Sequence, residues 1–241
     1  MKSPLSDHVA LVTGASRGIG RAVALRLARA GCRVAGVART ASDLEHTAQL
    51  AASEGHALLA VPVDVTCDAA VEDAVRVVRE RLGPITVLVN NAGVAPARGT
   101  VLKTPLAAWD RTLATCLRAP MVLVRLVLPD MLAHGDGAIV NIASVAGKRG
   151  RAGEAAYAAA KFGLLGFTQS LFAEVRDRGI KVTAICPGLV DTALIPPNKR
   201  VERSRFLQPS DVADAVYDVL ASPARTCPTE IVLEPQYDPE A

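Results

Sequence analysis

Short apolar runs alternate along the chain with longer segments in which apolar residues recur every three or four positions. The runs have the length of buried strands, and the longer segments have the periodicity of helices that cover a core. We predict strands at residues 9–12, 33–38, 56–63, 86–89, 138–142, 181–186 and 231–233. We predict helices after the first strand and at residues 42–53, 71–82, 105–114, 121–132, 154–176 and 210–220. This alternation is typical of a parallel sheet covered on both faces, so the predicted fold is a doubly wound α/β sheet of three layers.

The pattern also predicts the domain organisation. No internal repeat or linker divides the chain, and 241 residues that are 50% hydrophobic can bury one large core. We therefore predict a single domain over residues 1–241. Residues 196–206 have neither clear periodicity nor an apolar face. Irregular loops often carry function, so we expect a substrate lid at residues 193–207.

Composition excludes several classes of partner. The formal net charge of +3, from 27 basic and 24 acidic residues, is too small and dispersed to favour nucleic acid or a membrane surface. Aromatic residues are only 3%, which weakens any case for base stacking. The five cysteines form no C-x-x-C pair, the N-terminus has no apolar segment, and we predict no metal site. We expect a cytoplasmic protein with reduced thiols.

A glycine-rich turn follows the first strand and opens the first helix. Gly14, Gly18 and Gly20 allow a tight turn and leave room for a phosphate against the main chain. The free N–H groups at the start of the helix would face that phosphate. An ordinary βα turn would also fit, because the spacing is not the usual G-x-G-x-x-G.

The residues after the second strand indicate which nucleotide would bind. An NAD site carries an acid there, whereas this chain has Arg39, and its nearest carboxylates, Asp43 and Glu45, already lie in the next helix. Arg39 offers a planar, charged fork to a 2′-phosphate, and Arg17 in the glycine turn adds a second cation. The sequence therefore favours NADP(H), although two merely solvated arginines remain the alternative.

Candidate chemistry lies in the predicted helix at residues 154–176. Tyr157 and Lys161 are four apart, so they share one helical face, and the nearby cation favours the phenolate form of the tyrosine. Such a tyrosine could donate a proton to a carbonyl oxygen as hydride arrives. Ser144, just after a predicted strand, could hydrogen-bond the same oxygen, although a serine there is more often a cap or turn residue.

Taken together, these residues resemble the short-chain dehydrogenase/reductase family from about residue 9 to residue 233. The motifs are TGASRGIG at 13–20, Asp64-Val65, NNAG at 90–93, Ser144, Tyr157 with Lys161, and Pro187-Gly188 with Thr192. The resemblance implies a Rossmann-type fold and an NAD(P)-dependent oxidoreductase. It implies Ser144, Tyr157 and Lys161 as catalytic residues. It also implies a homodimer or homotetramer that pairs through the two long helices.

The resemblance also implies roles at the cofactor. Asp64 and Val65 would hold the adenine, the main chain of Ala92 and Gly93 would border the adenosine ribose, and Asn90 would brace the central strands. Lys161 would hold the nicotinamide ribose, while Pro187, Gly188 and Thr192 would orient the nicotinamide. The predicted cofactor-binding residues are Gly14, Ser16, Arg17, Gly18, Ile19, Gly20, Arg39, Asp64, Val65, Asn91, Ala92, Gly93, Tyr157, Lys161, Pro187, Gly188, Val190 and Thr192.

One position departs from the family. Cys116 stands where the family usually has an asparagine that belongs to a proton relay through water to the lysine. A thiol is a poor hydrogen-bonding group, although a backbone carbonyl could still hold the water. We therefore expect a slowed enzyme.

Basic residues flank the expected mouth of the site: Lys148, Arg149, Arg151, Lys199, Arg200, Arg203 and Arg205. If they converge they would favour an anionic substrate or an acidic carrier, and a solvated charged loop is the alternative. The main hypothesis is an NADPH-dependent reductase of a ketone, aldehyde or 3-oxoacyl group. The rival hypotheses are a catalytically weak NADP-binding sensor or scaffold, and an NAD-linked alcohol dehydrogenase.

Overall fold

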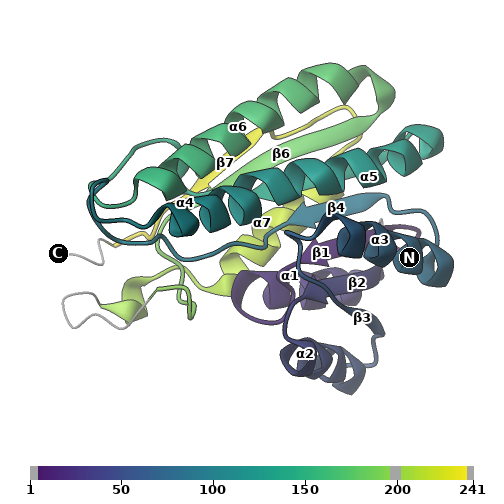
Figure 1. Ribbon diagram of the computed structural model, residues 1–241. Helices are drawn as coiled ribbons and strands as arrows, with labels where there is room; N and C mark the ends of the chain where they lie inside the picture. Colours follow the sequence, from purple (N-terminus) through teal and green to yellow (C-terminus); the bar gives the residue numbers. More distant parts are fainter. Residues whose placement is uncertain (1–4, 196–201, 238–241) are drawn as a thin grey trace.

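A single parallel sheet forms the centre of the protein. The computed structural model describes residues 5–195 and 202–237. Its seven strands lie in the order β3-β2-β1-β4-β5-β6-β7 (Figure 1), and every neighbouring pair is parallel. They are β1 (Val9–Thr13), β2 (Arg33–Ala38), β3 (Leu58–Pro62), β4 (Val87–Asn90), β5 (Gly137–Ile142), β6 (Ile180–Pro187) and β7 (Glu230–Leu233).

Helices cover both faces of the sheet. They are α1 (Gly18–Arg29), α2 (Ala41–Ser53), α3 (Asp68–Leu82), α4 (Leu106–Leu113), α5 (Ala119–His134), α6 (Ala155–Val175) and α7 (Pro209–Ala221). Side chains of β1 alternate between two cores: Ala10 and Val12 pack with α1, α2 and α7, whereas Val9 and Leu11 pack with α3, α5 and α6. Because strand side chains point to opposite faces in turn, both faces need an apolar cover. The predicted doubly wound, three-layer α/β fold is confirmed.

One helical stretch differs from the prediction. The two helices predicted at 105–114 and 121–132 are continuous over Leu106–His134, and Figure 1 shows α4 and α5 in line. A π-helical turn, Ala114–Arg118, joins them and ends just before Pro120. Proline in a regular α-helix collides with the carbonyl four residues earlier, and a wider turn relieves that collision. Pro120 therefore marks a bulge and not the expected break.

The same stretch is also unusually apolar. Among the described residues, Leu106–His134 alone is long and apolar enough to cross a membrane by length and composition. Its side chains Leu123, Val127 and Met131 are buried against the sheet. The face that the helix buries in the core thus explains part of its hydropathy.

The chain reverses its direction of travel across the sheet between β1 and β4. After β1 it builds β2 and β3 on one side, and it then crosses to β4 on the other. Connections that diverge in this way leave a crevice at the carboxyl ends of the two strands. There Thr13 Oγ1 accepts hydrogen bonds from the N–H groups of Asn91 and Ala92, each at 2.9 Å. Below them Asn90 donates to Asn141 Oδ1 at 2.9 Å and so braces β4 against β5, as expected.

Candidate active site

A cleft of about 1500 Å³ opens at this edge of the sheet. It is lined by the glycine turn, by the carboxyl ends of the central strands, and by the segment that follows β6. Nearly all of the predicted catalytic and cofactor-binding residues lie on its walls: Gly14, Ser16, Arg17, Gly18, Ile19, Arg39, Asp64, Val65, Asn91, Ala92, Gly93, Ser144, Tyr157, Lys161, Pro187, Gly188, Val190 and Thr192. Residues far apart in the sequence therefore meet in one place.

The predicted residue outside this lining is Gly20, the third glycine of the turn. A Cβ on Gly20 would lie 2.2 Å from the Gly14 carbonyl oxygen and 2.4 Å from Asn91 Nδ2. Real atoms do not approach so closely, so a side chain here would push α1 away from β1 and the Asn91 loop. The structure thus places Gly20 beneath the turn, where it permits close packing of helix and strand.

The other two glycines shape the turn itself. Gly14 and Gly18 have φ angles of +66° and +54°, which side-chain-bearing residues rarely adopt. Helix α1 begins directly at Gly18, and no side chain caps it at Arg17. Its first N–H groups therefore face the cleft without a side-chain acceptor, which is the arrangement that binds phosphate.

Two exposed cations border this end of the cleft. Arg17 and Arg39 both line it, and neither forms an ion pair within residues 5–195 and 202–237. Arg21, by contrast, donates to the Ser16 carbonyl and to Thr47 Oγ1, which ties the turn to α2. Arg21 was missed by the sequence analysis, because nothing in its spacing points to these acceptors.

Asp64, whose carboxylate interacts electrostatically with Arg39, is held in a fixed orientation. Its Oδ1 accepts hydrogen bonds from the Thr66 N–H at 2.9 Å and from the Thr66 hydroxyl at 2.8 Å. These bonds, together with the charge of Arg39, hold the pKa of the Asp64 carboxyl below its usual range. Asp64 is therefore a charged acceptor of fixed orientation at the end of β3.

The predicted catalytic residues lie at the other end of the cleft. Lys161 is only 5% exposed, and its ammonium donates to the Ile142 carbonyl at the end of β5, at 2.8 Å. Its Nζ lies 5.7 Å from the centre of the Tyr157 ring. Ser144 Oγ accepts a hydrogen bond from the Ala146 N–H at 3.1 Å, so this serine caps a short turn as well as facing the cleft.

The segment after β6 closes one side of this end. The Gly188 N–H donates to the Leu233 carbonyl at 2.7 Å, and a Cβ on Gly188 would lie 2.3 Å from Glu234 Oε2. The lack of a side chain therefore lets the C-terminal segment pack beside the cleft. Of the predicted lid at 193–207, residues 193–195 and 206 line the cleft, while 196–201 lie outside the described residues.

Four of the seven basic residues expected at the mouth form ion pairs, and Arg151 lines the cleft. Lys148 pairs with Glu230 and Arg149 with Glu234, while Arg203 pairs with Asp191 and Arg205 with Glu202. Glu230 and Glu234 come from a segment distant in sequence, so their pairing could not be foreseen, whereas Glu202 lies three positions from Arg205 and was expected to dilute the charge. Lys199 and Arg200 lie outside the described residues. The four paired side chains do not form a bare cationic patch, which argues for the solvated-loop alternative.

Cys116, which replaces the usual asparagine, is in the π-helical turn. It is 1% exposed, and its Sγ lies 3.8 Å from the position of a Cβ on Gly93. The thiol thus sits directly behind the loop that follows β4.

Comparison with known proteins agrees with this arrangement. The family model described as short chain dehydrogenase matches residues 8–202 of the chain. The chain belongs to the short-chain dehydrogenase/reductase family. As a member it is an oxidoreductase, and the family predicted from the motifs is confirmed.

Relatives in this family cover nearly the whole chain. The ketoacyl reductase HetN of Nostoc sp. is 37% identical over 88% of this chain and 75% of its own. The 3-oxoacyl-[acyl-carrier-protein] reductase FabG of Vibrio cholerae is 34% identical over 91% of each chain. A metagenomic short-chain oxidoreductase in complex with NADP superposes with a TM-score of 0.84, at 33% identity over 97% of this chain and 99% of its own. A variant of the actinorhodin polyketide ketoreductase with NADPH superposes with a TM-score of 0.85, at 35% identity over 94% of this chain and 95% of its own.

Proposed function

We propose that the protein is an NADPH-dependent reductase that transfers hydride to a carbonyl group. The observation that carries this proposal is that Tyr157, Ser144 and the buried Lys161 line the same cleft as the glycine turn, Arg17 and Arg39. One end of that space suits a phosphorylated adenosine, and the other suits proton transfer.

The chain's own residues would act as follows. The dinucleotide, when bound, supplies the hydride that reaches the carbonyl carbon. Tyr157 donates its hydroxyl proton to the carbonyl oxygen, which leaves an alcohol and a phenolate. Ser144 donates a hydrogen bond to the same oxygen, and its own oxygen is held by the Ala146 N–H. The Lys161 ammonium, anchored on Ile142, stabilises the phenolate and keeps two further donors for the ribose.

The choice of NADP(H) over NAD(H) rests on charge. Arg17 and Arg39, which have no ion-pair partner among the described residues, offer guanidinium groups at the cleft where an NAD site would carry a carboxylate. The two solved relatives bound to NADP and NADPH support the same choice. An NAD-linked alcohol dehydrogenase is therefore the less favoured alternative.

The substrate class is a ketone, aldehyde or 3-oxoacyl compound. Two relatives with ketoacyl or 3-oxoacyl activity in their names favour the last of these. The ion pairs of Lys148 and Arg149 weaken the case for an anionic substrate.

A second candidate function follows from Cys116. A buried thiol at the relay position favours a weak enzyme, or a protein that senses NADP(H) without reducing a substrate. The presence of Ser144, Tyr157 and Lys161 in one cleft favours the enzyme.

We also propose a homodimer or homotetramer in the cytoplasm. Leu106 on α4, Met121 on α5 and Phe162 on α6 are 71%, 43% and 47% exposed, and α4 packs on α6 (Figure 1). Exposed apolar side chains on neighbouring helices favour pairing with a second copy. All five cysteines are free thiols, as a reducing compartment would keep them.

Oxidation of NADPH in the presence of a panel of ketones, aldehydes, quinones and 3-oxoacyl thioesters tests the proposal, with Tyr157→Phe as the control. Steady turnover that the control lacks is the expected result. Tight NADPH binding without turnover on any member would favour the sensor, and no binding of dinucleotide would overturn both.

A further inference from the structure

The segment after β6 is supported by the segment that leads into α7. At one end, main-chain bonds join them: the Leu207 N–H donates to the Leu189 carbonyl at 3.0 Å, and the Asp191 N–H donates to the Leu207 carbonyl at 2.8 Å. At the other end, the connection is made by the side chain of Arg203. Residues 188–195 are thus held at two points.

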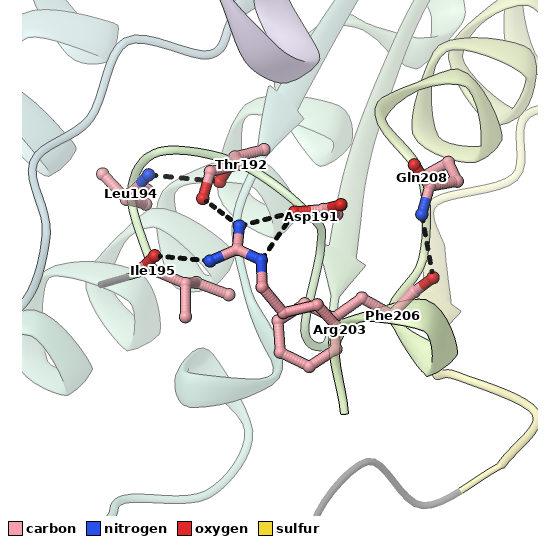
Figure 2. Close-up of polar contacts among 7 residues, drawn as sticks. All are labelled: Asp191, Thr192, Leu194, Ile195, Arg203, Phe206 and Gln208. Carbon is pink, nitrogen blue, oxygen red and sulfur yellow. Dashed lines mark hydrogen bonds and ion pairs between the residues drawn. The ribbon is translucent and has the colours of Figure 1, made fainter. Parts of the chain in front are cut away.

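Arg203 uses most of its donors in this connection, as Figure 2 shows. Its Nε donates to Asp191 Oδ1 at 2.9 Å, and Nη2 donates to the same oxygen and to the Thr192 carbonyl, the latter at 2.9 Å. Nη1 donates to the Ile195 carbonyl at 3.1 Å. The Phe206 ring, 5% exposed, packs beside the guanidinium at 5.6 Å. Four of the five N–H donors of an arginine are therefore committed to one short loop.

The arginine itself stays behind the wall of the cleft. Asp191, Thr192 and Ile195 line the cleft, whereas Arg203 does not. Any influence of Arg203 on a bound ligand must therefore pass through the residues that it holds.

Thr192 connects this loop to the glycine turn. Its Cγ2 lies 3.2 Å from the position of a Cβ on Gly18, and its Oγ1 accepts a hydrogen bond from the Leu194 N–H at 3.3 Å. The side chain thus sits against the start of α1, where the phosphates are expected. A shift of the Thr192 main chain would move this contact directly.

We propose that Arg203 is a positioning residue that sets how the nicotinamide half of the dinucleotide is held, by fixing the main chain of Thr192 and Ile195. The inference rests on the proposed function, because it takes Thr192 as a contact of the nicotinamide. It assigns to Arg203 an internal role in place of the electrostatic steering of substrate that its position in the sequence suggests.

An arginine is needed at position 203 because its three acceptors lie around the plane of one guanidinium group. The guanidinium presents its donors in a rigid fork, which here reaches a carboxylate on one side and two carbonyls on the other. A lysine is a point charge with a flexible stem, so it could keep the ion pair with Asp191 but not both carbonyl contacts. Arg203→Lys therefore separates loop positioning from the presence of a charge.

The test measures the binding of two ligands to the full chain by calorimetry. NADPH contacts both ends of the cleft, whereas adenosine 2′-monophosphate carries only the adenosine and its 2′-phosphate, with no phosphate for the start of α1. For Arg203→Ala and Arg203→Lys we expect the Kd for NADPH to rise about tenfold, since several charge-assisted hydrogen bonds are lost. The Kd for adenosine 2′-monophosphate should stay within about twofold. Arg205→Ala, two positions along and paired with Glu202 away from the cleft, is the matched control and should change neither value.

Each other outcome has a definite meaning. Equal weakening of both ligands, unchanged NADPH binding, or full rescue by lysine would overturn the positioning role. If Arg203→Ala does not fold, Asp191→Asn removes the charged acceptor with a smaller change in volume, and it should show the same selectivity for NADPH. If the unaltered protein binds neither ligand, the proposed function fails, and this inference fails with it.

Discussion

The two ends of the cleft are built in different ways. The adenosine end is made mainly by the ends of three consecutive strands within residues 14–65, which carry Arg17, Arg39 and Asp64, together with the loop at 91–93. The Tyr157 end is assembled from segments near residues 144, 161, 190, 203 and 233, which long-range hydrogen bonds hold together.

The adenosine end is therefore shaped by its local backbone, whereas the Tyr157 end is held in place by contacts from distant segments. At the adenosine end, the turn geometry of three glycines creates the site, and Arg17 and Arg39 form no ion pair in the part of the chain that the structure describes. At the other end, functional side chains depend on partners elsewhere, such as Lys161 on the Ile142 carbonyl. Substitutions at the adenosine end should change the affinity for the dinucleotide. Substitutions at the Tyr157 end should change kcat as well.

The largest expected effect is at the Tyr157 end. Tyr157→Phe removes the proposed proton donor and leaves the ring, so kcat should fall by about 10²- to 10⁴-fold. The Kd for NADPH should change by less than about threefold, because no charged contact is lost. Steady-state rates and calorimetry on the same preparation would check this split. A variant with undiminished kcat would assign the proton to another group.

A smaller but selective effect is expected at the adenosine end. Arg39→Asp replaces a cation by a carboxylate, so the KM for NADPH should rise about 30-fold more than the KM for NADH, a difference of about 2 kcal/mol. Ser42→Ala, in the same region but outside the cleft lining, is a suitable control. Equal changes for the two cofactors would remove Arg39 from recognition of the 2′-phosphate.

The smallest effect is expected from Cys116→Asn. The amide would supply the donor and acceptor that the thiol lacks, so kcat should increase about threefold if water reaches this position. The Kd for NADPH should not change. Solvent isotope effects on kcat, before and after the substitution, would show whether proton transfer became faster. An unchanged or lower rate would mean that the relay does not use this side chain.

Much of the fold could be predicted because its signals are local. Each strand is a short apolar run, and the glycine turn, the Tyr157–Lys161 spacing and Arg39 are read from neighbouring residues. Three features could not be predicted for the opposite reason. The ion pairs of Lys148 and Arg149 depend on the final strand β7 and the residue after it. The sequence around Pro120 does not show whether the proline ends the helix or is accommodated by a π-helical turn, as it is here. The contacts of Arg203 depend on a loop that folds back on itself.

Reduction of a carbonyl with NADPH that carries deuterium at the transferable position of the nicotinamide tests the central claim most directly. Mass spectrometry of the alcohol should find one deuterium on the former carbonyl carbon when the unaltered chain is used, formed far more slowly with Tyr157→Phe. An alcohol without deuterium, or equal rates from the two proteins, would contradict hydride transfer in this cleft with Tyr157 as the proton donor.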